Sequence, residues 1–258
     1  MLKEIVAFKR QELIETKQRL SMQELLEQLP EETPPSFESA LSQPGVNIVA
    51  EIKYRSPSRG AFACQLGPSD LAEVYAQNGA RALSILTEKK YFDGDLGFLE
   101  EVRRQSELPL LRKDFIVERY QVAEARVRGA SAFLLIVTCL SGAELRDLIS
   151  YGKDLQLDAL VEVHDAFELE RAMESGARII GVNNRNLGTF EVDIQTSFEL
   201  ARRLEGEEGR ILVSESGIRE HTQIKELQDA GFSAFLIGST LMDSSHPGET
   251  LRQLRGRE

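Results

Sequence analysis

Several short apolar runs in this sequence end in charged or amide side chains. The side chains concerned are Glu51 and Lys53, Lys113, Glu162, Asn183 and Glu215. Burying an unpaired carboxylate or ammonium inside a sheet costs about 5 kcal/mol or more. At the carboxyl ends of parallel strands, however, the same groups converge on one open mouth and can act on a substrate there. The pattern therefore favours a catalytic barrel over a passive domain.

Two lysines among three glutamates could supply acid–base catalysis. Glu51 and Lys53 are two residues apart, so in a strand their side chains share one face. In a partly dry pocket, desolvation raises the pKa of a glutamate and lowers that of a lysine, while opposite charges counter both shifts. Such a pocket provides a proton donor and an acceptor near neutral pH. Each residue alone could equally form a structural salt bridge, but their shared rim favours catalysis.

Two segments rich in Gly and Ser predict a phosphate site. They read SESGI and IGSTL, and each follows an apolar run. Barrels often bind phosphate after their last two strands, through backbone N–H groups and the start of a short helix. Gly217 and Gly238 would let the backbone approach the anion, and Ser216 and Ser239 would add hydroxyl donors. The alternative is an ordinary strand-to-helix turn, where Gly and Ser are common.

The sequence contains no motif typical of a metal site or of a serine nucleophile. His164, His221 and His246 are isolated, without HxH or HExxH spacing, so no metal site is predicted. His164 follows a predicted strand, and we expect it to be a structural hydrogen-bonding residue. No GxSxG motif is present, and Cys139 is expected to fill apolar space just past the fourth run.

Eight apolar runs alternate with helical patterns. The predicted strands are 46–53, 82–87, 108–112, 132–137, 158–162, 178–182, 210–214 and 233–237, and the predicted helices are 69–77, 95–106, 118–128, 142–153, 166–175, 195–205, 219–230 and 248–256. The runs are short and apolar on both faces, as buried parallel strands are. Strict alternation with eight strands predicts a closed (βα)₈ TIM barrel of the α/β class. A doubly wound open sheet is the alternative, although no GxGxxG follows an early run.

Helix ends carry their own signals. Glycines stand where a positive φ would end a helix, at Gly79, Gly129, Gly176 and Gly231. Two helix starts resemble capping boxes, Ser141 with Glu144 and Asp165 with Glu168.

Residues 1–45 do not fit the repeat, so we expect an N-terminal helical extension before a barrel that covers 46–258 in a single overall domain. The pattern predicts a helix over 1–20 and a second short one over 22–29. Either the extension plugs the bottom of the barrel, or it helps to cover the substrate. The sequence leaves both interpretations open.

Composition narrows the function classes. The chain has 258 residues, and such barrels typically take about 250. A net charge of −11 without a Lys/Arg tract argues against a nucleic-acid partner, whereas small anionic substrates remain possible. The two cysteines form no disulfide framework, which indicates a reducing compartment. No apolar run approaches about 20 residues and the N-terminus is charged throughout, so we expect a cytoplasmic protein without membrane contact.

From about residue 46 to 255 the sequence resembles the indole-3-glycerol phosphate synthase family. The segments that carry the resemblance are AEIK-x-x-SPSRG (50–60), TEKKYFDG (87–94), LPLLRKDF (108–115), LVEVHD (160–165), NNRNLGTFEVD (183–193), LVSESGI (212–218) and FLIGSTLM (235–242). The resemblance implies a TIM barrel with an N-terminal helical extension. It also implies a carboxy-lyase of tryptophan biosynthesis that converts 1-(2-carboxyphenylamino)-1-deoxyribulose 5-phosphate to indole-3-glycerol phosphate, releasing carbon dioxide and water without a metal or cofactor. We expect a monomer or a weak homodimer.

The resemblance also implies roles for single residues. Lys113 is similar to the family's general acid, which polarises the ketone, and Lys53 looks like the second lysine near the substrate carboxylate and phosphate. Glu162 resembles the carboxylate tied to proton removal and dehydration. The other matches are Glu51, Asn183, Glu215 and Ser216 as groups that orient substrate and hold the lysines, Ser56 and Arg185 as substrate contacts, Gly217, Gly238 and Ser239 as the phosphate cradle, and Phe92, Phe115, Leu134 and Leu187 as an apolar wall.

The sequence departs from the family pattern in two loops. Tyr54 and Arg55 stand where a basic and then a small residue are usual, beside the SPSRG loop, and FDGD at 92–95 is slightly unusual.

Two other functions stay open on the residues alone. One is another phosphosugar-binding barrel, such as an aldolase with a Schiff base on Lys113 or Lys53. The other is a catalytically silent barrel that serves as a subunit.

Overall fold

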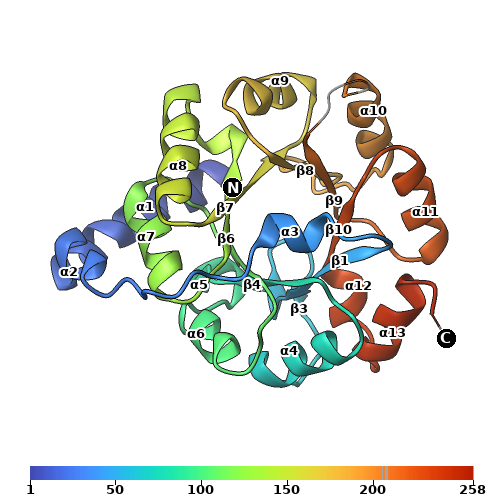
Figure 1. Cartoon of the computed structure of the whole chain (residues 1–258), viewed down its shortest axis with the longest axis horizontal. Coiled ribbons are helices and arrows are strands. Elements are labelled where there is room, and N and C mark those ends of the chain that lie inside the picture. Colours follow the sequence, from blue (N-terminus) through green and yellow to red (C-terminus); the bar gives the residue numbers. More distant parts are fainter. Residues whose placement is uncertain (205, 207–208, 258) are drawn as a thin grey trace.

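A computed structural model of the chain describes residues 1–204, 206 and 209–257. Among these residues, eight parallel strands close into a barrel in the order β1-β10-β9-β8-β7-β6-β5-β4, and Figure 1 shows this ring inside a layer of helices. The strands are β1 (Asn47–Ile52), β4 (Ala82–Leu86), β5 (Leu110–Lys113), β6 (Ala132–Ile136), β7 (Asp158–Val163), β8 (Ile179–Asn183), β9 (Ile211–Glu215) and β10 (Ala234–Ile237). The predicted closed barrel is confirmed, and the open-sheet alternative is wrong.

A helix follows each strand and packs on the outside of the barrel. These helices are α4 (Pro68–Gln77), α6 (Gly97–Arg103), α7 (Arg119–Val127), α8 (Gly142–Asp154), α9 (Ala166–Glu174), α10 (Gln195–Arg203), α11 (His221–Asp229) and α13 (Pro247–Leu254). Their ends differ from the prediction by a few residues at most, as helix ends commonly do. The predicted end of one helix at residue 205 lies outside the described residues. No helix within the described part of the chain is long and apolar enough to cross a membrane.

Short elements in the loops after the strands were not predicted as such. They are the hairpin of β2 (Arg55–Ser56) and β3 (Gly60–Ala61), α5 (Lys89–Phe92), the 3₁₀ turn η1 (Val137–Cys139) and α12 (Ser239–Met242). Segments of two to four residues are too short to show a hydrophobic period. All of them follow strand ends, so they shape the mouth of the barrel.

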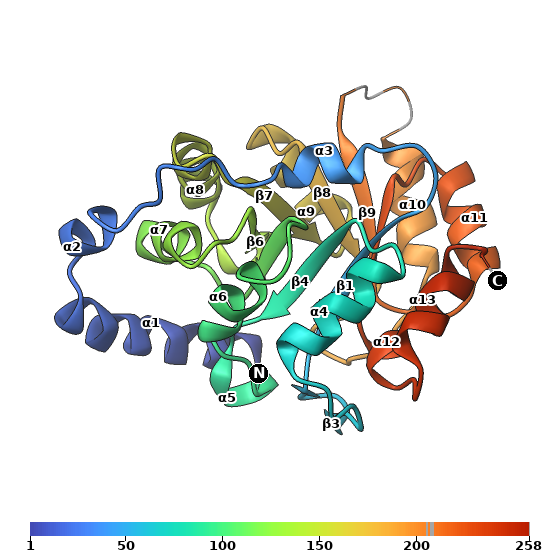
Figure 2. The same cartoon turned by 60° about the horizontal axis from the view of Figure 1, so that its bottom comes forward.

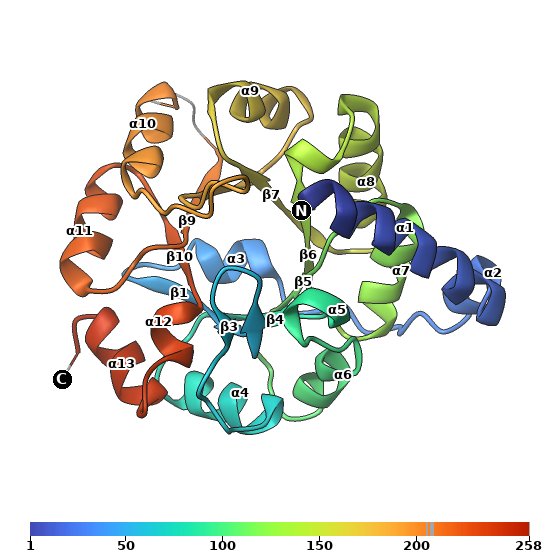
Figure 3. The ribbon, with the colours of Figure 1, turned by 180° about the vertical axis from the view of Figure 1, so that it is seen from behind.

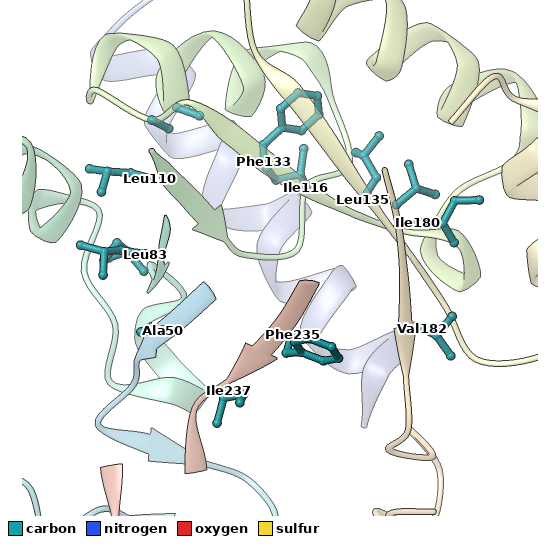
Figure 4. Packing of buried hydrophobic residues seen from close by; sticks show 14 of the residues in the cluster. Ala50, Leu83, Leu110, Ile116, Phe133, Leu135, Ile180, Val182, Phe235 and Ile237 are labelled. Carbon is teal, nitrogen blue, oxygen red and sulfur yellow. The ribbon is translucent and has the colours of Figure 1, made fainter. Parts of the chain in front are cut away.

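Residues alternate between two apolar clusters along each strand, because successive side chains of a strand point to opposite faces. Leu83, Leu110 and Phe133 pack with residues of the surrounding helices, and Figure 4 shows these side chains. Val49 and Leu160 belong to the other cluster, which fills the barrel interior. The inward-facing series continues, two residues further along, into the charged residues at the strand ends.

The N-terminal extension contacts both ends of the barrel. The short helix α3 (Phe37–Leu41) buries Phe37 and Leu41 completely in the interior cluster, so it plugs the amino ends of the strands. Helix α1 (Leu2–Arg19) lies at the other end, as Figure 2 shows, followed by α2 (Met22–Leu26). Seen from behind in Figure 3, the start of α1 lies beside the barrel opening. The plug is therefore α3, a helix that was not predicted. A role of α1 in covering the substrate stays a prediction.

The helix-end signals were largely right. The four glycines named above have φ between 83 and 100°. Ser141 and Glu144 form a reciprocal capping box. Asp165 accepts a hydrogen bond from the Glu168 N–H, but the Glu168 carboxylate turns to His164 instead of the Asp165 backbone, so that capping box is only half formed.

Candidate active site

A cavity of about 580 Å³ opens at the carboxyl ends of the strands. Every residue predicted for the site lines it: Glu51, Lys53, Ser56, Phe92, Lys113, Phe115, Leu134, Glu162, Asn183, Arg185, Leu187, Glu215, Ser216, Gly217, Gly238 and Ser239. These side chains come from segments up to 188 residues apart, since Glu51 and Ser239 mark their ends. The fold thus brings the whole predicted set to one opening.

The charged side chains form one layer of the barrel. Glu51, Lys113, Glu162 and Glu215 project inward from β1, β5, β7 and β9, which are alternate strands of the barrel. Four side chains from alternate strands make one layer in such barrels. Two residues earlier on the same four strands, the interior cluster holds apolar side chains, so the charges lie on a largely apolar floor: Val49, Leu111, Leu160 and Val213.

Lys113 is the centre of this layer. Its Nζ donates to Glu162 Oε2 at 2.8 Å and to Glu215 Oε2 at 3.0 Å. Burial lowers the pKa of Lys113, but the charges of Glu162 and Glu215 outweigh burial and raise the pKa above its usual range. The lysine is therefore a firmly protonated hydrogen-bond donor facing the cavity.

The two glutamates beside Lys113 differ in protonation. Burial raises the pKa of Glu162, but Lys113 and His164 together bring it below its usual range. For Glu215, burial is the largest influence, and Glu162 and Glu51 add to it, so its pKa rises to about 7 although Lys113 opposes this. The pair beside Lys113 therefore holds one ionised carboxylate and one that titrates near neutrality.

Glu51 and Lys53 form the predicted pair on the first strand. Lys53 Nζ lies 2.5 Å from Glu51 Oε1 and 5.5 Å from the centre of the Phe62 ring. A β-carbon on Gly238 would clash with the Glu51 carboxylate, so glycine is required there for the glutamate to pack. Lys53 is more open to the cavity than Glu51, which leaves its ammonium free to meet an anionic ligand.

Glycine and serine backbone lines the end of the cavity beside β9 and β10. Ser216 and Gly217 both have positive φ, 68 and 87°, a conformation that is uncommon for a non-glycine residue. Gly238 precedes the short helix α12 and Ser239 begins it. Arg59 and Arg219 also line the cavity and were missed, although the arginine of SPSRG was a signal for the first. Guanidinium groups and backbone N–H groups together suit a phosphate.

Aromatic and aliphatic side chains line the same cavity. The ring centres of Phe92 and Phe115 are 6.0 Å apart at a tilt of 41°, and Leu134 and Leu187 extend the apolar lining. Helix α1 contributes Leu2 and Ile5, which sequence reasoning did not place here. Their apolar spacing along the helix indicated a buried face but not its partner. A flat aromatic ring would find apolar contacts beside the charged layer.

The SPSRG loop is tied down at several points. Tyr54 Oη donates to the Leu66 carbonyl at 3.0 Å, Arg55 lies 3.7 Å from Asp93, and Arg59 pairs with Asp243. The two departures from the family pattern thus belong to contacts that join this loop to its neighbours.

His164 makes the expected hydrogen bond, from Nδ1 to Glu168 Oε2 at 2.9 Å, and lies beside Glu162 as well.

Cys64 and Cys139 are free thiols, and burial raises the pKa of Cys139 to about 12, as expected for a packed thiol. Within the described residues, no group of three or more His, Cys, Asp or Glu side chains is placed to hold a metal ion. The chemically distinctive feature of the cavity is the layer of charges around Lys113.

Comparisons with known proteins show the family of this chain. The family model for indole-3-glycerol phosphate synthase matches residues 2–254. The indole-3-glycerol phosphate synthase of Carboxydothermus hydrogenoformans is 42% identical over 261 residues, which cover 98% of both chains. That of Lachnoclostridium phytofermentans is 47% identical over 219 residues, covering 85% of this chain and 80% of the relative. A crystal structure of KGPDC from Streptococcus mutans has a TM-score of 0.62 at 11% identity, covering 82% of this chain and 96% of that one, which shows a shared fold. Because the family match spans nearly the whole chain and includes every strand of the barrel, the chain belongs to the indole-3-glycerol phosphate synthase family.

Proposed function

We propose that the protein converts 1-(2-carboxyphenylamino)-1-deoxyribulose 5-phosphate to indole-3-glycerol phosphate, with release of carbon dioxide and water. The observation that carries the proposal is Lys113, held between Glu162 and Glu215 at the floor of a cavity that also has an apolar lining. Ring closure needs a proton donor at a ketone and a proton acceptor nearby, next to a surface for the aromatic ring. All three lie within this cavity.

Lys113 is the proposed general acid of ring closure. Its ammonium would donate to the ketone oxygen while the ring carbon that bears the carboxylate attacks the ketone carbon. A carbon–carbon bond forms, the ketone oxygen becomes a hydroxyl, and ring aromaticity is lost for the moment. A fixed ammonium stabilises the negative charge that develops on the oxygen, and the largely apolar floor strengthens that interaction.

Decarboxylation and dehydration complete the reaction. The carbon–carboxylate bond breaks, carbon dioxide leaves, and its electron pair restores the aromatic ring. The new hydroxyl then takes up a proton from a lysine of the site, its carbon–oxygen bond breaks as the ring nitrogen donates its electron pair, and water leaves. Glu162 accepts the proton that the adjacent carbon of the five-membered ring loses, which gives the aromatic indole. Lys53 is the proposed contact for the substrate carboxylate and phosphate, and Asn183 and Ser216 are proposed to orient the substrate.

The proposed substrate contacts extend to the rim of the cavity. Gly217, Gly238 and Ser239 are proposed to hold the phosphate, with Ser56 and Arg185 as further contacts. The anthranilate ring is proposed to lie against Phe92, Phe115, Leu134 and Leu187. This assignment is supported by the elements that carry the residues, since the polar backbone follows β9 and β10, whereas the apolar residues come from β6 and from the segments after β4, β5 and β8.

Isotopic labelling tests the proposed function. Substrate labelled at the carboxyl carbon should release one labelled carbon dioxide for each indole-3-glycerol phosphate found by mass spectrometry, and EDTA should leave the rate unchanged. Borohydride trapping of the carbonyl substrate on Lys113 or Lys53 would instead indicate an aldolase-type mechanism. Substrate that binds without losing carbon dioxide would contradict the proposal.

We also propose that the protein acts in the cytoplasm, as a monomer or a weak homodimer, and that residues 1–45 serve as an extension of one barrel domain. The exposed large apolar residues of the described chain lie on separate elements, including Ile14 of α1 and Phe167 of α9, which supports at most a weak interface. Sedimentation equilibrium across a range of concentrations checks the oligomeric state. A stable dimer at low concentration would be the contrary result.

A further inference from the structure

The two glutamates beside Lys113 are nearly equivalent in their direct contacts with it. Glu162 Oε2 and Glu215 Oε2 lie 2.8 and 3.0 Å from the same Nζ, and each side chain is 2% exposed. A pair of buried carboxylates that share one cation tends to hold a proton between them, because the second negative charge is costly to bury. Neither distance nor burial decides which glutamate carries that proton.

His164 contacts only one of the pair. Its Nε2 lies 3.3 Å from Glu162 Oε1, the oxygen that Lys113 does not contact, as an ion pair without a hydrogen bond. The corresponding oxygen of Glu215, Oε1, is buried and has no hydrogen-bond partner in the described structure, and it packs over Gly181. Glu162 therefore meets positive charge at both oxygens, whereas Glu215 meets it at one.

Glu168 fixes the imidazole in place. Glu168 Oε2 accepts from the His164 backbone N–H at 2.9 Å and lies 2.9 Å from Nδ1, and the other oxygen of Glu168 accepts from Thr138. The ring thus lies between two carboxylates. Burial lowers the pKa of His164, but its contacts with Glu162 and Glu168 raise it to about 10, so the ring is an imidazolium at neutral pH.

One further charge near the pair, that of Glu51, acts in the same direction. Glu51 is a further negative charge near Glu215 and favours a proton there, and Lys53 pairs with Glu51 instead of with either member of the pair. The thiol of Cys139 is the other titratable group near Glu162, and burial keeps it neutral by raising its pKa to about 12. Two features therefore distinguish the two glutamates: the contact of Glu162 with His164, and the charge of Glu51 near Glu215.

We propose that His164 is a positioning residue that makes the two glutamates unequal: it keeps Glu162 ionised, so that the proton shared by the pair near neutral pH lies on Glu215. The inference rests on the function proposed above, in which Glu162 must be ionised to accept a proton. A second cavity, of about 350 Å³, lies beside the ring and is lined by Thr138, His164 and Glu168, among other residues.

Carbon-13 NMR of glutamate side chains in the ligand-free enzyme tests this directly. The Glu162 signal is assigned by its loss in Glu162→Gln, and its titration is followed in wild type and in His164→Asn. Removing an opposite charge at this range should raise the Glu162 midpoint by about one to three pH units. Glu168→Gln, which keeps the ring but loosens it, should give a smaller rise. His221→Asn is the matched control, because His221 hydrogen-bonds the Leu254 carbonyl on the outside of the barrel.

Kinetics supply the second readout. In His164→Asn the acidic limb of the pH profile of kcat should move to higher pH by the same amount as the NMR midpoint, and KM should change less than about twofold. Free imidazole, entering through the second cavity, should partly restore the wild-type profile. An unchanged Glu162 midpoint in a folded His164→Asn or Glu168→Gln enzyme would overturn the inference while leaving the proposed reaction intact. A shifted midpoint in a protein that forms no indole product would support the role of His164 and count against the reaction alone.

Discussion

Lys9 Nζ lies 3.2 Å from Asp114 Oδ1, so helix α1 is ion-paired to the residue that follows Lys113. Both side chains are buried, and Asp114 is also held by Arg112 Nη2 at 3.1 Å and by the Thr87 hydroxyl at 2.7 Å. Burial raises the pKa of Asp114, but Arg112 and Lys9 outweigh it and leave the pKa below its usual range. The helix beside the mouth and the strand that carries Lys113 therefore share one buried charge network.

Lys9→Met should destabilise the fold markedly. Removing one partner of a buried ion pair costs about 3–5 kcal/mol, and because Arg112 still faces Asp114 we expect the lower end of that range. Lys17→Met is the matched control on the same helix, since Lys17 pairs with Glu118 at the surface and should contribute less than about 1 kcal/mol. Urea unfolding measures the loss of unfolding free energy in Lys9→Met and in Lys17→Met. Equal effects of the two substitutions would contradict the buried role of Lys9.

The effect of Lys9→Met should also depend on pH. Because the pKa of Asp114 is lowered by folding, its stabilisation is present above the unfolded value of about 4 and is lost as the pH falls. The difference in unfolding free energy between wild type and Lys9→Met should therefore shrink in acid. A difference that stays constant from neutral pH to about pH 3 would show that Lys9 acts through packing instead of charge.

Gly181→Ala should impair catalysis more than folding. A β-carbon at this position would clash with the Glu215 carboxylate, which must then move away from Lys113. We expect kcat to fall by about tenfold or more, within the range of lost acid–base assistance, with a smaller change in KM. Gly142→Ala, at the start of α8, has only an ordinary contact at 3.7 Å and should keep full activity. Full activity in Gly181→Ala would mean that the position of Glu215 does not matter.

Glu215→Gln should change the pH dependence of stability. Folding raises the pKa of Glu215 to about 7 from an unfolded value of about 4, so the carboxyl's contribution is fully present below about pH 4 and lost as the pH rises through 7. Wild type should lose about 1 kcal/mol per pH unit across this window relative to Glu215→Gln. Unfolding in urea at a series of pH values gives the difference directly. A flat difference would place the shared proton elsewhere.

Lys113→Ala and Glu162→Gln should each lower kcat by at least about 100-fold, because each removes a proposed proton donor or acceptor. Lys225→Ala is the control for loss of a lysine, since Lys225 is exposed on α11, outside the barrel. Circular dichroism should show all three variants folded. Rates near wild type for Lys113→Ala or Glu162→Gln would refute the assigned roles.

The charged residues at the mouth of the barrel could be predicted from the sequence, because side chains along a strand alternate regularly between its two faces. A polar residue two positions after an inward apolar one must also face inward, so Lys113, Glu162 and Glu215 could be placed without coordinates. Contacts between distant segments were out of reach. The pairing of Lys9 with Asp114 spans 105 positions of the chain, and nothing in LVEVHD indicates that the His164 ring turns back toward Glu162.

The extension shows the same limit. Apolar residues in α1 and α3 indicate buried faces, yet periodicity does not say which surface covers them. Phe37 fills the closed end of the barrel and Ile5 lines the open end. The inequality of Glu162 and Glu215 was equally hidden, because it depends on a 3.3 Å contact and on burial, which a linear pattern does not encode.

A fluorescence assay with 1-(2-carboxyphenylamino)-1-deoxyribulose 5-phosphate tests whether Lys113 and its neighbours form the indole product. The chain has no tryptophan and five tyrosines, so emission from an indole product would be seen over a low background. We expect a rise in indole emission that requires the enzyme, persists in EDTA and is abolished in Lys113→Ala. A substrate that binds in the cavity but gives no indole emission would contradict the proposed reaction.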